Sequence, residues 1–193
     1  SNTGDIAATS TWSAASLLAS RDWTTREIVS QSSTGGGTVF KGTNVGATVN
    51  PSDAWGVTAD VIDYLRGDRS KEGSAFRTRT SLMGAIINAE PVLSREDDMV
   101  FVSSGEGMLH AFDTRAGTNR GKELWAFVPR AVLPDIGQTS ARAYTFKTQL
   151  DGTPVIGKVG TSTKLLVSGM GAAGRSYYAL DVTNPRTHTQ SDT

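Results

Sequence analysis

An internal repeat constrains the fold of this chain more than any other feature of its sequence. Three short segments recur in the same order, with offsets that grow from 63 to 68 residues. The pairs are EPVL at 90–93 with TPVI at 153–156, VFVSSG at 100–105 with LLVSGM at 165–170, and HAFD at 110–113 with YALD at 178–181. Such self-similarity indicates two copies of one structural unit whose loops differ in length.

The first copy, residues 98–129, is typical of a small antiparallel module. It has three apolar runs at 99–102, 108–113 and 124–128, separated by Gly-containing turns and closed by Pro129. Strands at this spacing with Gly-rich turns predict an all-β unit. The pattern resembles one blade of a quinoprotein-type β-propeller. We therefore expect an all-β fold, a partial, incomplete β-propeller with one or two short helices in the N-terminal part.

Two helices are expected before the repeat. Residues 12–19 (WSAASLLA) predict a short helix with Thr9, Ser10 or Thr11 as N-cap. Residues 52–66 predict a longer one, because apolar residues recur there near the helical period and Gly67 can end it. Ser52 or Asp53 is the expected N-cap of this second helix.

Further strands are expected along the chain, and the segment 130–139 predicts a helical turn broken by Pro134. Residues 84–94 predict a buried strand pair or one long bent strand, with Pro91 at an edge or a strand start. The other expected strands are 26–31, 39–41, 143–149, 152–159, 164–168 and 176–182.

The expected domain organisation follows from these elements. Residues 1–80 form a lead-in segment with the helix 52–66, and residues 81–193 form about two blades with an inserted loop at 129–145. Two blades cannot close a propeller, so an unpaired sheet edge is expected.

Composition excludes several classes of function. The chain has no cysteine, which removes disulfides, cysteine metal sites and cysteine nucleophiles. Its 19 basic residues balance 19 acidic residues, so overall charge gives no reason to expect a nucleic-acid partner. No apolar run approaches the length of a membrane-spanning helix, so membrane insertion is not expected.

The repeated polar and aromatic positions favour structural roles. Asp113 and Asp181 each follow a small residue at a strand end, where an Asp side chain accepts hydrogen bonds from the next turn. Trp125 is expected to pack between units. The two histidines, His110 and His188, form no convincing catalytic set with a Ser and an Asp. No catalytic or cofactor-binding residue is therefore predicted, and the chain is expected not to be an enzyme.

The acidic run Glu96–Asp98 is the only candidate for a metal site. Three consecutive acids on an extended segment do not converge on one cation, so a charged turn is the preferred interpretation. The Gly-rich loop at 32–38 lacks the following helix that a phosphate loop needs, and a surface loop is favoured there.

Several long segments carry a family resemblance. GEGMLHAFDTRAGTNRGKELWAFVPRAVLPDI (105–136), DGTPV (151–155) and LLVSGMGAAGRSYYALDVTNP (165–185) resemble the C-terminal domain of PilY-type type IV pilus tip adhesins. The resemblance extends over most of residues 55–185. The chain departs from the family pattern at Glu106, where Asp is usual, and by a few extra residues at 118–120.

The resemblance implies a non-catalytic pilus tip or pilus biogenesis factor that supports pilus assembly, twitching motility and adhesion. Its partners would be minor pilins and other pilus-tip components, with a host-cell receptor as a possible further one. It would be secreted through the periplasm and sit on the outer membrane or the fimbrium. The family's calcium site is expected elsewhere in the full-length domain, with no cofactor in this segment.

Two other functions and one receptor motif remain open at this stage. A periplasmic propeller scaffold for outer-membrane assembly is one alternative, and a non-functional remnant of a pyrroloquinoline-quinone dehydrogenase is another. Arg66, Gly67 and Asp68 form the tripeptide that integrins recognise, but a charged helix end with a C-terminal glycine explains it without any receptor and is the preferred interpretation.

Overall fold

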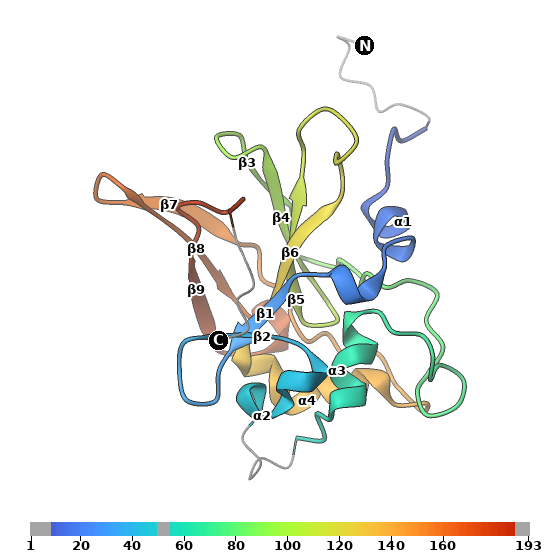
Figure 1. The fold of residues 1–193 in the computed structure, drawn as a ribbon. Helices are drawn as coiled ribbons and strands as arrows, with labels where there is room; N and C mark the ends of the chain where they lie inside the picture. The colour runs from blue at the N-terminus through green and yellow to red at the C-terminus, as the bar shows by residue number, and fades with distance from the viewer. Residues whose placement is uncertain (1–8, 50–54, 188–193) are drawn as a thin grey trace.

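The computed structural model describes residues 9–49 and 55–187, and most of its regular structure is β-sheet (Figure 1). The strands form two separate sheets, and neither sheet closes on itself. The strands are β1 Ile28–Gln31, β2 Gly37–Val39, β3 Val92–Ser94, β4 Met99–Ser104, β5 Met108–Asp113, β6 Glu123–Val128, β7 Val155–Val159, β8 Thr163–Gly169 and β9 Tyr177–Asp181.

The first sheet has six strands in the order β2-β1-β6-β5-β4-β3. Its antiparallel part, β3 to β6, contains the three strands predicted in residues 98–129 and confirms that prediction. β1 extends this unit by pairing parallel to β6, with Ile28 opposite Ala126. The second sheet, β7-β8-β9, is antiparallel and contains the strands expected in the second copy of the repeat.

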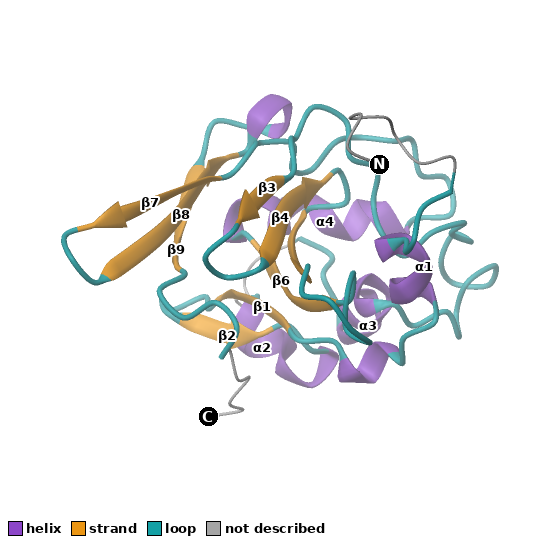
Figure 2. Ribbon diagram, turned by 90° about the horizontal axis from the view of Figure 1, so that it is seen from above, coloured by secondary structure: helices purple, strands orange, loops and turns teal. Residues whose placement is uncertain are grey.

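The helices are short and occupy the connections. They are α1 Ala14–Ala19, α2 Val45–Thr48, α3 Ala59–Arg66 and α4 Leu133–Ile136, with 3-10 turns η1 Trp23–Thr25, η2 Gly42–Asn44, η3 Arg130–Val132, η4 Gly137–Ser140 and η5 Gly171–Ala173. Seen from above, α1 and α3 lie on the other side of the first sheet from β7–β9 (Figure 2). The first sheet is therefore the middle layer of the molecule.

Both expected N-terminal helices exist, but their starts differ from the prediction. Ser13, not Thr9, Ser10 or Thr11, caps α1 by accepting a hydrogen bond from the Ser16 amide. The longer helix begins at Ala59, with Thr58 as its N-cap. Ser52 and Asp53, its expected caps, lie outside the described residues. Gly56 has a φ of 66°, a left-handed conformation, so the helix cannot extend back through it.

Two expected strands are wrong. Only Val92–Ser94 of the segment 84–94 is a strand, and Ile86 and Ile87, which we expected to be buried, are 42% and 51% exposed. Residues 143–149 form a loop in which Phe146 is 51% exposed. Alternating apolar residues predicted a strand there, but no neighbouring strand offers a ladder for its backbone.

Pro134 does not break the helical segment after β6. It lies at the start of α4, where a missing backbone N–H costs nothing. The inserted loop therefore consists of three consecutive helical turns from Arg130 to Ser140. Within the described residues, no helix is long and apolar enough to cross a membrane.

Candidate functional site

A buried polar cluster lies behind the first sheet, and sequence reasoning missed it. Ser104 ends β4, His110 lies on β5 and Glu123 begins β6, so the ladder brings all three to one face. The Ser104 Oγ lies 2.9 Å from His110 Nε2, and His110 Nδ1 lies 2.7 Å from Glu123 Oε2. Sequence reasoning looked for a Ser and an Asp beside His110 and found no convincing set, and it did not foresee that Ser104 and Glu123 lie on either side of this ring.

Arginine side chains neutralise this cluster. Arg26 donates from Nε and Nη2 to the two carboxylate oxygens of Glu123, at 2.9 and 3.0 Å. Burial alone would raise the pKa of Glu123, but the Arg26 charge and the His110 hydrogen bond outweigh it and hold that pKa far below its ordinary value. The ionised carboxylate thus joins β6 to the segment that leads into β1.

The arrangement resembles a Ser-His-acid triad, but its surroundings are those of a structural cluster. Ser104 and His110 are each 1% exposed. A nucleophilic serine needs space for a substrate carbonyl next to its Oγ, together with oxyanion donors. Five cavities of the described residues have neither Ser104 nor His110 in their lining, although Glu123 lines the one next to α1. The cluster holds strands together, and its serine and histidine are buried in the fold.

Arg66 belongs to the same buried region, which overturns the receptor-contact hypothesis for 66–68. Its side chain is 1% exposed and donates to the carbonyl oxygens of Phe40 and Arg26 at 2.8 and 2.6 Å. Burial lowers the pKa of Arg66 to about 10. Gly67 is the C-cap of α3, with a φ of 129°. An arginine held inside the fold is not available to a receptor, and the helix-end interpretation accounts for the tripeptide.

The repeated aspartates form turns, as predicted. The Asp113 Oδ1 accepts from the Arg115 amide at 2.8 Å, and the Asp181 Oδ1 accepts from the Thr183 amide at 2.9 Å. Their environments differ. Asp113 is fully buried and also binds the guanidinium of Arg186, which comes from the second copy of the repeat. Asp181 is exposed.

The two sheets are joined by contacts between the copies. Trp125 donates from Nε1 to the Pro185 carbonyl at 2.7 Å, so it packs between units as predicted. The Phe127 and Tyr178 rings lie 5.4 Å apart, and Ser103 donates to the Gly152 carbonyl at 2.8 Å. The face of the first sheet that carries Phe101, Trp125 and Phe127 is therefore covered by the second sheet.

The acidic run 96–98 lies in the β3–β4 turn and is occupied by cations of the second sheet. Lys164 contacts both carboxylate oxygens of Asp97, at 2.7 and 2.6 Å, and Lys158 lies 3.2 Å from Glu96. Carboxylates that already bind lysines do not suit calcium, which needs several free oxygen ligands. No group of three or more His, Cys, Asp or Glu in the described part of the chain is placed to hold a metal.

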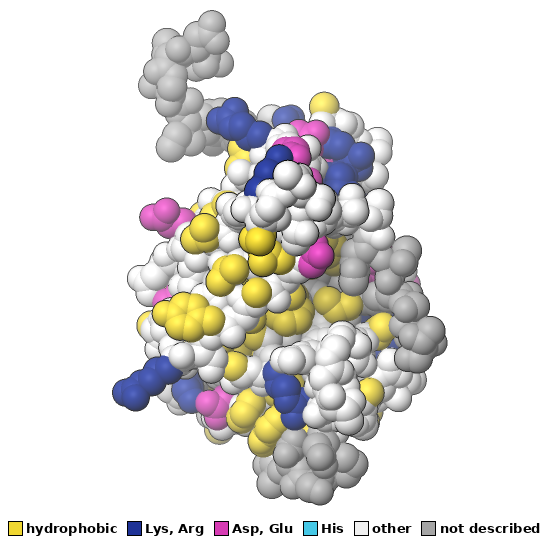
Figure 3. Space-filling model, turned by 90° about the vertical axis from the view of Figure 1, so that its left-hand side faces the viewer, with side chains coloured by type: hydrophobic (Ala, Val, Ile, Leu, Met, Phe, Trp, Pro, Cys, Tyr) yellow, Lys and Arg dark blue, Asp and Glu magenta, His cyan; other side chains and the backbone are white. Residues whose placement is uncertain are grey.

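The outer face of the second sheet is an exposed apolar surface. Val155, Val167 and Tyr177 are 67%, 40% and 81% exposed, and Val159 at the end of β7 is 56% exposed. Hydrophobic side chains gather over the middle of this side of the molecule (Figure 3). We call this set, Val155, Val159, Val167 and Tyr177, the outer patch. Contiguous exposed apolar surface of this kind marks a site of interaction.

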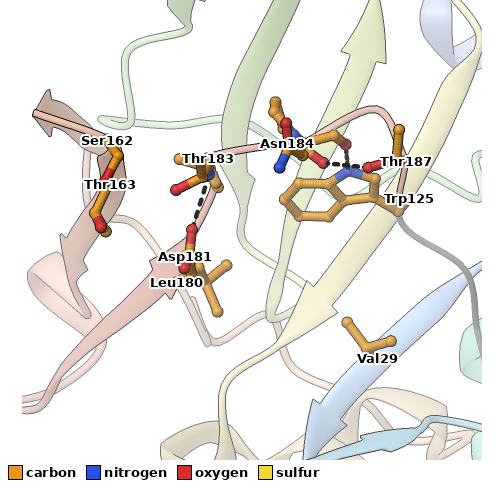
Figure 4. A pocket seen from close by; sticks show the side chains of 11 residues that line it. Val29, Trp125, Ser162, Thr163, Leu180, Asp181, Thr183, Asn184 and Thr187 are labelled. Atoms are coloured by element: carbon orange, nitrogen blue, oxygen red, sulfur yellow. Dashed lines mark hydrogen bonds between the residues drawn. The ribbon is translucent and has the colours of Figure 1, made fainter.

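A cavity of about 680 Å³ opens between the two sheets. Val29 and Trp125 line it from the first sheet, and Leu180 and Asp181 line it from β9 (Figure 4). The segment 182–187 crosses above it on the way back to the first sheet, where Arg186 binds Asp113.

Comparison with known proteins finds relatives of one kind. A type IV pilus biogenesis factor PilY1 homolog of Xylella fastidiosa is 33% identical over 181 residues, covering 76% of this chain and 14% of the relative. The type IV pilus biogenesis factor PilY1 of Pseudomonas aeruginosa strain PAK is 33% identical over 160 residues, covering 65% of this chain and 13% of that protein.

A further PilY1, from P. aeruginosa strain UCBPP-PA14, is 26% identical over 92% of this chain, which spans 19% of that protein. The chain therefore spans less than a fifth of the length of these relatives. No family model matches the chain, and no solved structure matches it.

Proposed function

The chain is a PilY1-type segment, related in sequence to type IV pilus biogenesis factors, and from this premise we propose that it serves pilus assembly as a non-catalytic interaction module. The observation that carries the proposal is the match to PilY1 proteins over 65–92% of the chain. The finer functions belong to the same proposal. They are twitching motility, adhesion to surfaces or host cells, and contact with minor pilins at the pilus tip on the cell surface.

The geometry supports an interaction function over catalysis. The one triad-like set, around His110, is sealed inside the fold and clamped by Arg26. The accessible features are the outer patch, which is apolar, and the cavity beside β9, which Trp125 and Leu180 line together with several polar side chains. Apolar surfaces of this kind associate with other protein surfaces.

We further propose that the repeat belongs to a β-propeller in the intact protein. Two observations support this arrangement: the second sheet packs on the first face to face, and its outer patch is the counterpart of the face that it covers. In a β-propeller the sheet of each blade would pack on one face of the sheet of the next blade. Calcium, if the intact protein binds it, would be held by residues outside 96–98.

Replacing exposed positions of this segment in the host organism tests the proposed function. Val167→Asp places a charge in the outer patch, and Thr161→Asp places the same charge at the exposed β7–β8 turn as the matched control. We expect Val167→Asp to reduce surface pili and twitching, with normal amounts of folded protein, and Thr161→Asp to leave both unchanged. Normal piliation after in-frame deletion of residues 84–187 would refute the pilus assignment.

A further inference from the structure

A cavity of about 590 Å³ lies between α1 and the start of β6. This volume is within the range of small-molecule binding sites. None of the lining residues comes from the second copy of the repeat, so the cavity belongs to the N-terminal helix and the first sheet alone. The side chains that line it are of three kinds: cationic, acidic and aliphatic.

The helix α1 is fixed against the turn that precedes β6, so this cavity is bounded by rigid elements. Gly121 in that turn has a φ of 81°, and a Cβ atom there would lie 3.0 Å from Leu17 and would collide with the ring of Trp12. Arg21, just after α1, donates from Nη1 to the Glu123 carbonyl at 2.7 Å. The helix and β6 are therefore tied together, and the cavity is preformed.

Two cations line the cavity and keep donors available for an anion. The Arg21 guanidinium has five N–H donors, and Glu123 and Thr25 accept from three of them. The exposed Lys122 ammonium donates to the Asn119 Oδ1 at 3.1 Å, which uses one of its three donors. A guanidinium and an ammonium at one cavity suit a carboxylate ligand.

Glu27 brings a carboxylate without a bound partner to the same cavity. Its half-buried side chain makes no hydrogen bond or ion pair with any described residue, and Arg21 attracts it only through space. The other acid of the lining, Glu123, is already held by Arg26. A half-buried carboxylate has lost part of its hydration, so an ammonium group of a ligand would replace what it lost.

Three leucines form the aliphatic part of the lining: Leu17, Leu18 and Leu124. Leu18 is 2% exposed, and Leu124 on β6 is half-buried. The lining includes no aromatic side chain. An aliphatic group that packs against these leucines adds affinity that does not depend on charge.

We propose that this cavity binds a zwitterion of the amino-acid class, a free amino acid or a short peptide with an aliphatic side chain. Arg21 and Lys122 hold its carboxylate, Glu27 accepts from its ammonium group, and the leucines contact its side chain. Asn119 belongs to the extra residues 118–120, so the site includes a part of the chain that departs from the PilY-type pattern. The proposal goes beyond pilus assembly and does not rest on it.

Probes of nearly the same shape separate the charges of the ligand. L-Leucine carries both charged groups, isocaproate lacks the ammonium group, and isoamylamine lacks the carboxylate. Each is titrated into the isotopically labelled protein, and the NMR shifts of the Gly121 and Leu124 amides report binding. L-Leucyl-L-leucine, titrated in the same way, distinguishes a short peptide from a free amino acid. This comparison uses the unmodified protein, so it stands even if a variant fails to fold.

Single substitutions assign each charge to a residue. Glu27→Gln should weaken leucine binding about tenfold and should not weaken isocaproate binding, because isocaproate has no ammonium group. Lys122→Gln should weaken the binding of leucine and isocaproate but not that of isoamylamine. Glu96→Gln and Lys158→Gln remove the same charges from an exposed pair that does not line the cavity, and they are the matched controls.

We expect leucine or the dipeptide to bind at least about tenfold more tightly than isocaproate and isoamylamine. Tighter binding of the dipeptide supports a short peptide as the ligand, and tighter binding of leucine supports a free amino acid. Equal binding of leucine, isocaproate and isoamylamine would mean that the cavity takes any aliphatic molecule, which overturns the proposal. The absence of any shift up to about 100 mM ligand, which covers the weak affinity expected of so small a molecule, also overturns it.

Discussion

Phe101 in the first sheet and Val167 in the second occupy matching positions in the strand pairing, one residue out of step with the sequence repeat, since each pairs with the alanine of an Ala-x-Asp strand end. Phe101 is 0% exposed and Val167 is 40% exposed. Leu109 and Tyr177, two residues before those alanines, differ more strongly, at 0% and 81%.

The difference between the sheets comes from their neighbours. The second sheet covers the face of the first that carries Phe101 and Leu109, whereas no described element covers the outer patch. The repeat therefore specifies a sheet with two apolar faces, and burial depends on the next unit. The outer patch lies on the face of the second sheet that corresponds to the covered face of the first, and no sheet among the described residues packs against it.

The largest expected effect tests this difference directly. Phe101→Ala leaves a cavity in the closed core and should lower the free energy of unfolding by about 3–5 kcal/mol. Val167→Ala, at the matching exposed position, should lower it by less than about 0.5 kcal/mol. Urea unfolding of both variants measures the two values. Similar losses would mean that the second sheet is covered in solution.

The next effect concerns the polar cluster, which the second copy lacks because Tyr178 stands where the first has His110. Glu123→Gln leaves the buried Arg26 charge without its carboxylate and should cost about 3 kcal/mol at neutral pH. Glu96→Gln, in an exposed pair with Lys158, is the control and should cost less than about 0.5 kcal/mol. If Glu123→Gln lowers the free energy of unfolding by less than about 1 kcal/mol, the ion pair between Glu123 and Arg26 does not stabilise the fold.

The pH dependence sharpens this test. The folded-state pKa of Glu123 lies far below its ordinary value of 4.5, so its stabilisation is present above that pH and declines as the pH falls towards the folded pKa. The stability difference between the unmodified protein and Glu123→Gln should therefore shrink below pH 4.5, by about 1.4 kcal/mol per pH unit. Asp113 titrates in both proteins, and the subtraction removes its contribution. A difference that stays constant down to about pH 3, well below the ordinary pKa of a glutamate, would contradict the assignment.

A smaller effect separates the two repeated aspartates. The hydrogen bonds from Arg115 and Arg186 outweigh burial and lower the pKa of Asp113, so Asp113→Asn should cost about 2 kcal/mol. Asp181→Asn should leave the unfolding midpoint nearly unchanged, because its carboxylate is exposed and holds only a local turn. Thermal unfolding measures both, and equal shifts would mean that Arg186 does not join the two units in solution.

The repeat made much of this fold predictable. Asp113 and Asp181 fixed the ends of matching strands, and the Gly-containing turns placed the strands between them. Short-range patterns failed where tertiary context decides. The left-handed conformation of Gly56 keeps α3 from starting earlier, and the helix begins at Ala59. Residues 143–149 alternate between apolar and polar side chains but have no neighbouring strand with which to pair among the described residues.

The polar cluster was not predictable from local sequence. Arg26 and Glu123 are 97 residues apart and meet only because β1 pairs parallel to β6. A lone histidine on an apolar strand was the available signal, together with the Glu that begins the neighbouring strand. Arg66 was misleading for the same reason, since its tripeptide shows nothing of the carbonyl groups that enclose it.

Native-state hydrogen exchange tests the central claim, that one repeat is complete and the other open. The Ala111 amide lies in the middle of the first sheet, whereas its counterpart Ala179 lies on β9, which pairs only with β8 among the described strands. The Val182 amide donates to the Lys164 carbonyl of β8, so the alternating Ala179 amide points away from β8. We predict slow exchange for Ala111 and fast exchange for Ala179, with protected amides at Leu180 and Val182 as the internal reference for an intact second sheet. Equal protection of Ala111 and Ala179 in the monomeric protein would contradict the account.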